Sequence, residues 1–303
     1  MIEDKSKILI VCSSLSGMLA AVELASRGFA VECLLDRPLS HILFAAQDDG
    51  LNAALDLKNS GDDITSHVYD SLAYSQGLAH EQTVKNICRT APRLINILER
   101  ARVEFLRTAE GYLDAALWDG SRFPRSFTGL SSLSHSIAQA LVEQMLFQQK
   151  LGRLVIHQDW ECLSVVLNEH STCRGVVAQN LNALEVRVFE ADAVIVAVSD
   201  MRGLYGHHAL APHPFSAALL SRLFDQGISL VDCEFLSFDN HLVDLALGGL
   251  CVNEEFMTPV DGLFAIGGSA AKCHGASVLP GNALLFELAS ALIATRHLPE
   301  YLG

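Results

Sequence analysis

The 303-residue sequence lacks paired cysteines, an excess of positive charge and any long apolar run. Its eight cysteines are spread singly, without a C-x-x-C pair, which argues against zinc-ribbon or iron–sulfur ligation. Lysine and arginine number 21 against 35 aspartate and glutamate, and the resulting charge of −14 argues against nucleic acid and anionic membranes as partners. No segment reaches the ~18 consecutive apolar residues of a membrane-spanning helix. We therefore expect a globular protein of a reducing, cytoplasmic compartment.

The N-terminal segment also allows a leader-peptide interpretation. Lys5 and Lys7 precede an uncharged run that ends before Glu23, and Val11-Cys12 is similar to a lipoprotein cleavage site. However, the residue before the cysteine is valine rather than a small residue, and "SSLS" interrupts the apolar run. We expect a folded element here rather than a leader.

The first 36 residues predict a strand, a helix and a second strand. Residues 7–11 form a short apolar run that suits a strand buried on both faces of a parallel sheet. Apolar residues at helical spacing follow, and Gly28 lies where the helix would end. Residues 30–36 (AVECLLD) predict the second strand, which completes a βαβ unit.

The rest of the chain predicts helices followed by strands. Residues 83–101 and 132–148 carry apolar residues three and four apart, and Pro92 is expected to bend or divide the first helix. From residue 153, short β-branched runs separated by turn residues predict a parallel strand and an antiparallel meander. The apolar segments 192–200 and 262–268 predict strands that return to the main sheet.

The turn between the first strand and the first helix has lost two glycines of a dinucleotide fingerprint. In that fingerprint one glycine allows the tight turn, one lets the backbone approach the pyrophosphate, and one packs the helix on the strand. Those positions hold Cys12, Ser14 and Gly17. Asp36 ends the second strand, where a carboxylate would hold a ribose hydroxyl pair. Both a nucleotide site and an ordinary βαβ unit with a solvated aspartate stay open from these residues.

Four segments, in this order, resemble the flavoprotein family of succinate dehydrogenase, fumarate reductase and L-aspartate oxidase. They are residues 45–55, 62–78, 261–268 and 273–285, and the resemblance runs from about residue 7 to residue 294. It implies an FAD-binding α/β domain interrupted by a capping domain, and hydride transfer between flavin N5 and a dicarboxylate or aspartate. The positions expected to contact FAD are Cys12, Ser14, Gly17, Asp36, Arg37, Gln47, Ala197, Gly267, Gly268, Gly281, Asn282 and Leu284.

The chain departs from the family pattern where the flavin would lie. The family's "AQGG" turn reads "AQDD" at residues 46–49, and its "ATGG" strand end reads "AVSD" at residues 197–200. Its "GDG" turn is "AAL" at residues 217–219, and its ribityl-binding acid is Gly268. His41 is close to the position that carries covalent flavin in the dehydrogenases, but the spacing is one residue too long, so a loop histidine is expected.

The residues that bind and protonate the substrate are also changed. The arginine that follows the family's "HGA" motif is Val278, and the "HPTG" turn falls at residues 238–240 (FDN). Between this turn and residues 248–252 the family inserts its capping domain, which supplies a second arginine that donates or accepts the substrate proton, but this chain has only "HLVDLAL". Without these arginines the family's closed site and proton shuttle cannot form.

Two other clusters carry little chemistry. His207, His208 and His213 lie in a proline-containing segment without nearby ligand partners, so we expect a surface loop and no metal. Cys273 and His274 could suggest a nucleophile and its base, but adjacent loop residues usually point apart. We predict no metal and leave the catalytic residues unknown.

The predicted fold is a Rossmann-like, doubly wound α/β FAD-binding domain with a β-meander insertion and no capping domain. A single domain would span residues 1–303: residues 7–150 supply the first βαβ unit and a helical segment, 151–191 a strand and the meander, and 192–303 the return strands and the last helix. Two functions stay open. One is an FAD-dependent oxidoreductase-like protein unable to process dicarboxylates by the family mechanism. The other is a flavin-free pseudoenzyme that acts as a binding or scaffold subunit, with a protein partner or self-association covering the uncapped face.

Overall fold

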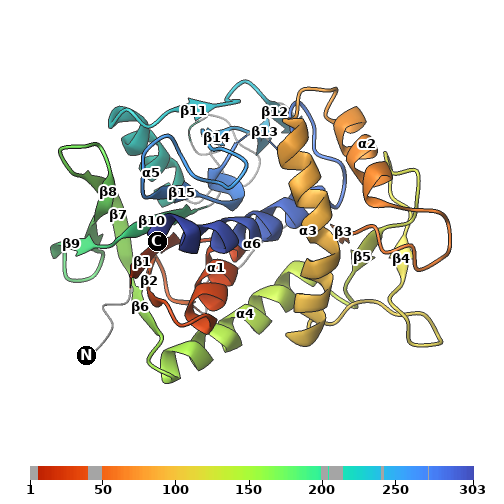
Figure 1. Ribbon diagram of the computed structural model, residues 1–303, viewed down its shortest axis with the longest axis horizontal. Helices are drawn as coiled ribbons and strands as arrows, with labels where there is room; N and C mark the ends of the chain where they lie inside the picture. Colours follow the sequence, from red (N-terminus) through yellow and green to blue (C-terminus); the bar gives the residue numbers. More distant parts are fainter. Residues whose placement is uncertain (1–5, 40–49, 199–203, 205–213, 240–241, 272) are drawn as a thin grey trace.

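A five-stranded parallel sheet forms the centre of the chain (Figure 1). The computed structural model describes residues 6–39, 50–198, 204, 214–239, 242–271 and 273–303. The strand order is β15-β10-β1-β2-β6, and every neighbouring pair is parallel. The strands are β1 (Lys7–Cys12), β2 (Ala30–Leu35), β6 (Leu154–Gln158), β10 (Ala193–Ala197) and β15 (Leu263–Ala265). The chain order reverses between β1 and β10, which makes their carboxyl ends the switch point where such folds bind ligands.

Helices pack on this sheet and on one another. The helix α1 connects β1 to β2 and packs between α4 and α6, and α6 also contacts α3 (Figure 1). Pro92 does not divide α3, which runs unbroken on both sides of it. Among the described residues the α-helices are α1 (Leu15–Ser26), α2 (Ile64–Tyr74), α3 (Glu81–Arg100), α4 (Leu133–Lys150), α5 (Pro214–Asp225) and α6 (Asn282–Leu302).

The predicted meander is the antiparallel sheet β7 (Trp160–Leu167), β8 (Cys173–Asn180) and β9 (Val186–Glu190). Its strands β7 and β8 contact β2 and β10 of the parallel sheet. The side-chain amide of Gln226, just after α5, pairs with both the N–H and the C=O of Val165 on β7. The helices and the meander together bury both faces of β1 and β10, which explains their continuous apolar sequences.

Smaller sheets complete the described chain. One consists of β3 (Gly50–Asn52), β4 (Ala115–Ala116) and β5 (Ser126–Thr128), and two further pairs are β11 (Leu230–Val231) with β14 (Gly249–Leu250) and β12 (Leu236–Asp239) with β13 (Leu242–Ala246). A short 3-10 helix, η3 (Gly267–Ser269), follows β15. In the region where the family inserts a capping domain, the described residues form only the β12–β13 hairpin, in agreement with the prediction of no such domain.

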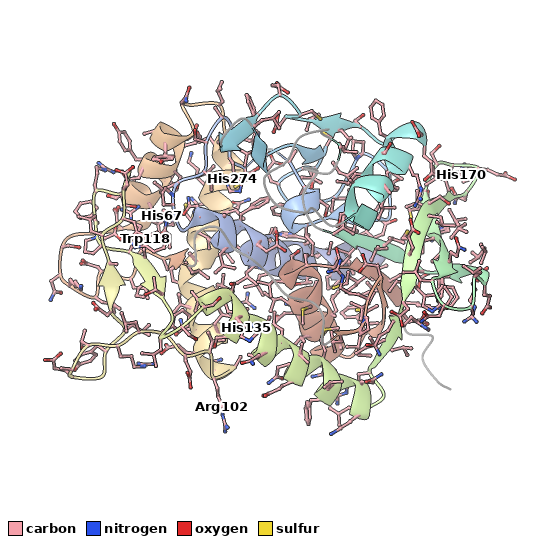
Figure 2. The ribbon with its side chains drawn as sticks, turned by 180° about the vertical axis from the view of Figure 1, so that it is seen from behind. His67, Arg102, Trp118, His135, His170 and His274 are labelled. Carbon is pink, nitrogen blue, oxygen red and sulfur yellow. The ribbon has the colours of Figure 1, made fainter. Side chains whose placement is uncertain are left out.

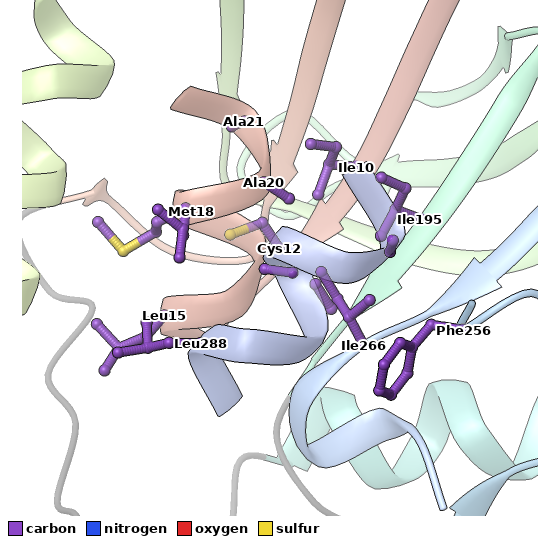
Figure 3. Packing of buried hydrophobic residues seen from close by; sticks show 14 of the residues in the cluster. Ile10, Cys12, Leu15, Met18, Ala20, Ala21, Ile195, Phe256, Ile266 and Leu288 are labelled. Atoms are coloured by element: carbon purple, nitrogen blue, oxygen red, sulfur yellow. The ribbon is translucent and has the colours of Figure 1, made fainter. Parts of the chain in front are cut away.

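The core is continuous from β1 through α1 to α6. Figure 3 shows Cys12 and Ile10 of β1 beneath α1, with Leu15 and Leu288 meeting between the two helices. Ile266, beside β15, lies in the same cluster and is fully buried. This packing fixes the amino end of α1 against the carboxyl ends of β1, β10 and β15. No helix among the described residues is long and apolar enough to cross a membrane.

Candidate functional site

The amino end of α1 lies at the switch point, where this class of fold binds phosphate groups. Ser14 caps the helix: its hydroxyl accepts from the N–H of Gly17 (3.5 Å) and donates to the carbonyl of Ala197 (2.9 Å). The N–H of Ser13 donates to the same carbonyl (3.0 Å), and its hydroxyl lies 3.4 Å from that of Ser216 on α5. Ser13 and Ser14 are only 6% and 3% exposed. The hydroxyl groups of both serines therefore have hydrogen-bond partners within the protein.

Gly17 brings α1 close to the sheet. A Cβ atom here would lie 2.7 Å from Sγ of Cys12 and 2.9 Å from Cβ of Ala197, so only glycine fits. This agrees with the packing role expected from the sequence. Burial raises the pKa of the Cys12 thiol to about 12, so the thiol is protonated at neutral pH and packs as an apolar group.

A carboxylate that the sequence analysis did not identify lies at the same point. Oε1 of Glu287 accepts from the N–H of Ser16 (3.1 Å), and Oε2 accepts from the N–H of Gly268 (3.0 Å). Gly267 has a left-handed backbone (φ +58°), and a Cβ there would overlap the side chains of Ser16 and Glu287. The available signal was that Glu287 is the one charged residue in the segment 283–294.

Asp36 follows β2 at the same edge of the sheet. Its side chain is only 10% exposed. The interpretation as an ordinary βαβ unit had assumed a solvated aspartate, which this burial contradicts. Burial raises the pKa of this carboxyl to about 6, while the Arg37 guanidinium, with Nε 3.2 Å from Oδ1, lowers it. The surroundings of this carboxyl thus favour its protonated form more than water does.

The start of α6 is fixed by a buried polar network. Gly281 is the N-cap in a left-handed conformation (φ +86°), so Asn282 begins the helix rather than capping it. Oδ1 of Asn282 accepts from Nδ2 of Asn52 (2.9 Å) and lies 3.0 Å from Nε2 of His67, while Nδ2 donates to Oγ of Ser71 (2.8 Å). Burial lowers the pKa of His67 to about 4, so its ring is neutral. Both Oδ1 and Nδ2 of Asn282 are therefore hydrogen-bonded within the protein.

Cys273 is buried and His274 is half-buried. Both line one small cavity of about 10 Å³, beside Cys88, which has room for a single water molecule. Figure 2 places His274 and His67 at the same end of the molecule. Burial raises the pKa of Cys273 well above its ordinary value and lowers that of His274 to about 4. A buried, protonated thiol is a poor nucleophile, so this pair does not form a catalytic dyad.

A buried ionic cluster joins α2 to the segment that enters β5. Arg125 is fully buried, with Nη2 2.7 Å from Asp62 and 3.0 Å from Asp70. Arg122 pairs with Asp70 from the surface side and lies over the ring of Tyr69. These charges are paired with one another, which suits a structural role.

The fold gathers most of the predicted cofactor contacts at two places. At the carboxyl ends of β1, β10 and β15 lie Cys12, Ser14, Gly17, Ala197, Gly267 and Gly268, with Asp36 and Arg37 beyond the neighbouring β2. At the start of α6 lie Gly281, Asn282 and the buried Leu284. Outside the described residues are Gln47, Asp48, Asp49, His41, His207, His208 and His213. No cluster of three metal-ligating side chains occurs in the described part of the chain.

The described residues do not fit the pyrophosphate of a bound FAD in this arrangement. Such a group would use the first backbone N–H groups of α1. The N–H of Ser16 is bonded to Glu287 and that of Gly17 to Ser14. Residues 13–16 are at most 6% exposed.

The fold and site therefore define an α/β protein with the architecture of dinucleotide-binding domains and an altered phosphate site. Residues 7–228 match the FAD binding domain family, and the chain belongs to this family. It is 31% identical over 233 residues to the succinate dehydrogenase flavoprotein subunit of Bacillus subtilis (strain 168), covering 77% of this chain and 40% of that protein. It is 27% identical over 234 residues to the L-aspartate oxidase of Pyrococcus furiosus, covering 77% and 45%. The chain is thus related to FAD-dependent oxidoreductases of the succinate dehydrogenase, fumarate reductase and L-aspartate oxidase type.

Solved structures share the fold. Mycobacterium smegmatis Sdh1 in complex with UQ1 matches with a TM-score of 0.86 and 15% identity, covering 97% of this chain and 69% of that one. A flavocytochrome c3 fumarate reductase in its open conformation matches with a TM-score of 0.80 and 12% identity, covering 99% and 79%. The chain spans about two fifths of the length of the curated succinate dehydrogenase subunits that it matches.

Proposed function

We propose that this chain is a flavin-free member of its family that acts as a binding subunit rather than as a redox enzyme. The observation that carries the proposal is the closed amino end of α1. Its capping serine bonds to Ala197, Ser13 lies against Ser216, and the N–H groups of Ser16 and Gly17 bond to side chains of the protein itself. A dinucleotide would have to displace all of these contacts.

The positions that bind and enclose the substrate in the family support the same proposal. Val278 replaces the arginine that binds a substrate carboxylate in the family, and a valine offers no charge to a dicarboxylate. The β12–β13 hairpin is too short to close over a substrate and exclude water. We therefore expect no oxidation of succinate and no reduction of fumarate.

The cofactor part is tested with protein purified without added flavin. We expect no absorbance bands near ~370 and ~450 nm, and no heat of binding in a calorimetric titration with FAD. Flavin at a stoichiometric level, weakened by Asp36→Ala, would instead establish a working FAD site and overturn the proposal. The Asp119→Ala variant serves as the matched control, because Asp119 is exposed in the turn between β4 and β5.

The binding part concerns the face that a capping domain covers in the family. We propose that a protein partner or a second copy covers this face, and the relatives named as subunits support such a role. A photo-cross-linking residue at Glu234, which is exposed and lies two residues before the β12–β13 hairpin, should give a cross-linked product in cells. The same residue at Leu184, which is 70% exposed in the meander, is the control. Equal cross-linking at both positions, or none at Glu234, would contradict the assignment of the face.

A further inference from the structure

Glu287 is a charged residue in an otherwise uncharged part of α6. The segment 283–294 is otherwise composed of apolar and small residues, and most of it is buried. A carboxylate in such surroundings must be paired or hydrogen-bonded to be tolerated. Its partners are two backbone N–H groups rather than a lysine or an arginine.

These two N–H groups come from different elements. Ser16 is the second residue of α1, and its N–H is among those that a helix leaves without an internal partner. Gly268 lies in η3, immediately after β15. The two elements meet because β1 and β15 flank β10 in the parallel sheet. Each carboxylate oxygen accepts one N–H, at 3.1 Å and 3.0 Å.

The pocket around the carboxylate fits it closely. Gly267 holds a left-handed conformation, and a Cβ atom there would overlap both Oγ of Ser16 and Oε2 of Glu287. The positive end of the α1 dipole faces the negative group, which stabilises it. Two N–H donors, a helix N-terminus and a glycine turn form the set of features that holds a phosphate in dinucleotide-binding folds.

We propose that Glu287 is an internal replacement for the dinucleotide pyrophosphate. Its carboxylate occupies the anion position at the switch point, ties α6 to α1 and η3, and closes the position to nucleotide phosphates. This inference deepens the proposed flavin-free function, on which it rests, by naming the group that fills the site. It also explains how a fold built around a bound anion keeps these elements together.

The test is amide hydrogen exchange measured residue by residue by NMR. In Glu287→Ala the amides of Ser16 and Gly268 should exchange at least about tenfold faster than in the unmodified protein, because both lose their acceptor. The thermal midpoint should fall by several degrees. Glu300→Ala is the matched control, since its carboxylate lies on the same helix but is 78% exposed.

Chemical rescue gives a second measurement. Sodium formate, which supplies a small carboxylate, should restore the thermal midpoint and the protection of both amides in Glu287→Ala, with saturation. Sodium chloride at equal ionic strength should not. If Glu287→Ala does not fold, Glu287→Gln carries the test: its single acceptor oxygen can serve only one of the two amides, so one should lose protection.

The outcomes separate this inference from the proposed function. Unchanged amide protection and thermal midpoint in Glu287→Ala would overturn the inference, whether or not the protein binds FAD. FAD binding by the unmodified protein, together with lost protection in Glu287→Ala, would overturn the flavin-free function and the closure of the position to nucleotide phosphates, but it would support the bonds of Glu287 to both amides in the ligand-free protein.

Discussion

Replacing Asp36 by asparagine should stabilise the protein at neutral pH and have little effect near pH 4. Burial raises the pKa of this carboxyl from 3.8 to about 6, with Arg37 offsetting part of the effect. Between these values the folded protein holds the proton and the unfolded chain has released it, so stability falls as the pH rises from about 4 to about 6. Above this window the folded state carries the full cost of a buried charge.

The size of the effect follows from the shift. A difference of about 2 pKa units, at about 1.4 kcal/mol per unit, gives about 3 kcal/mol at neutral pH. The side chain is only 10% exposed, so solvent screening reduces this figure little. Asparagine is similar in shape to the protonated acid, and Asp36→Asn should therefore gain on the order of 2–3 kcal/mol at pH 7.

The assay is urea unfolding of both proteins at pH 4, 5, 6 and 7, followed by circular dichroism. The difference in free energy of unfolding should grow with pH and level off above pH 7. The exposed Asp119→Asn variant should stay within ~0.5 kcal/mol at each pH. A loss of stability in Asp36→Asn at pH 7, or an equal gain at pH 4 and pH 7, would refute the assignment of the effect to a buried charge.

Two further substitutions test the ends of α6 and α2. Gly281→Ala should lower the free energy of unfolding by about 2–4 kcal/mol, because alanine is strained at φ +86° and its Cβ would lie 2.5 Å from Oδ1 of Asn52. Gly152→Ala, at φ +68° in open space, should lose only about 1 kcal/mol; equal losses in urea unfolding would contradict the role of the contact. Arg125→Met should lose about 3–5 kcal/mol at pH 7, because it leaves the buried carboxylate of Asp62 without its cationic partner and removes one of the two cations that pair with Asp70. Arg122→Met removes a half-exposed partner and should lose under ~1 kcal/mol; similar losses for both arginines would disprove the buried-charge argument.

Local sequence patterns were sufficient to predict the main strands and helices. The apolar runs at 7–11 and 192–200 predicted buried parallel strands, which are β1 and β10, because such strands have both faces covered. The β-branched runs after residue 153 predicted the meander in the same way. Of the two outcomes expected for Pro92, a bend or a division of its helix, division is wrong: α3 continues past it, because many apolar side chains of α3 are buried in the core.

The sequence by itself determined the class of fold, the family and the loss of the fingerprint glycines, because these depend on residue types at fixed spacings. Only the tertiary structure decided what replaces them. Glu287 and Ser16 lie at opposite ends of the chain and meet because α6 packs on α1. The burial of Asp36, and the shared cavity of Cys273 and His274, likewise depend on distant elements. Spacing along a chain predicts local conformation, whereas the environment of a charge is set by whatever folds against it.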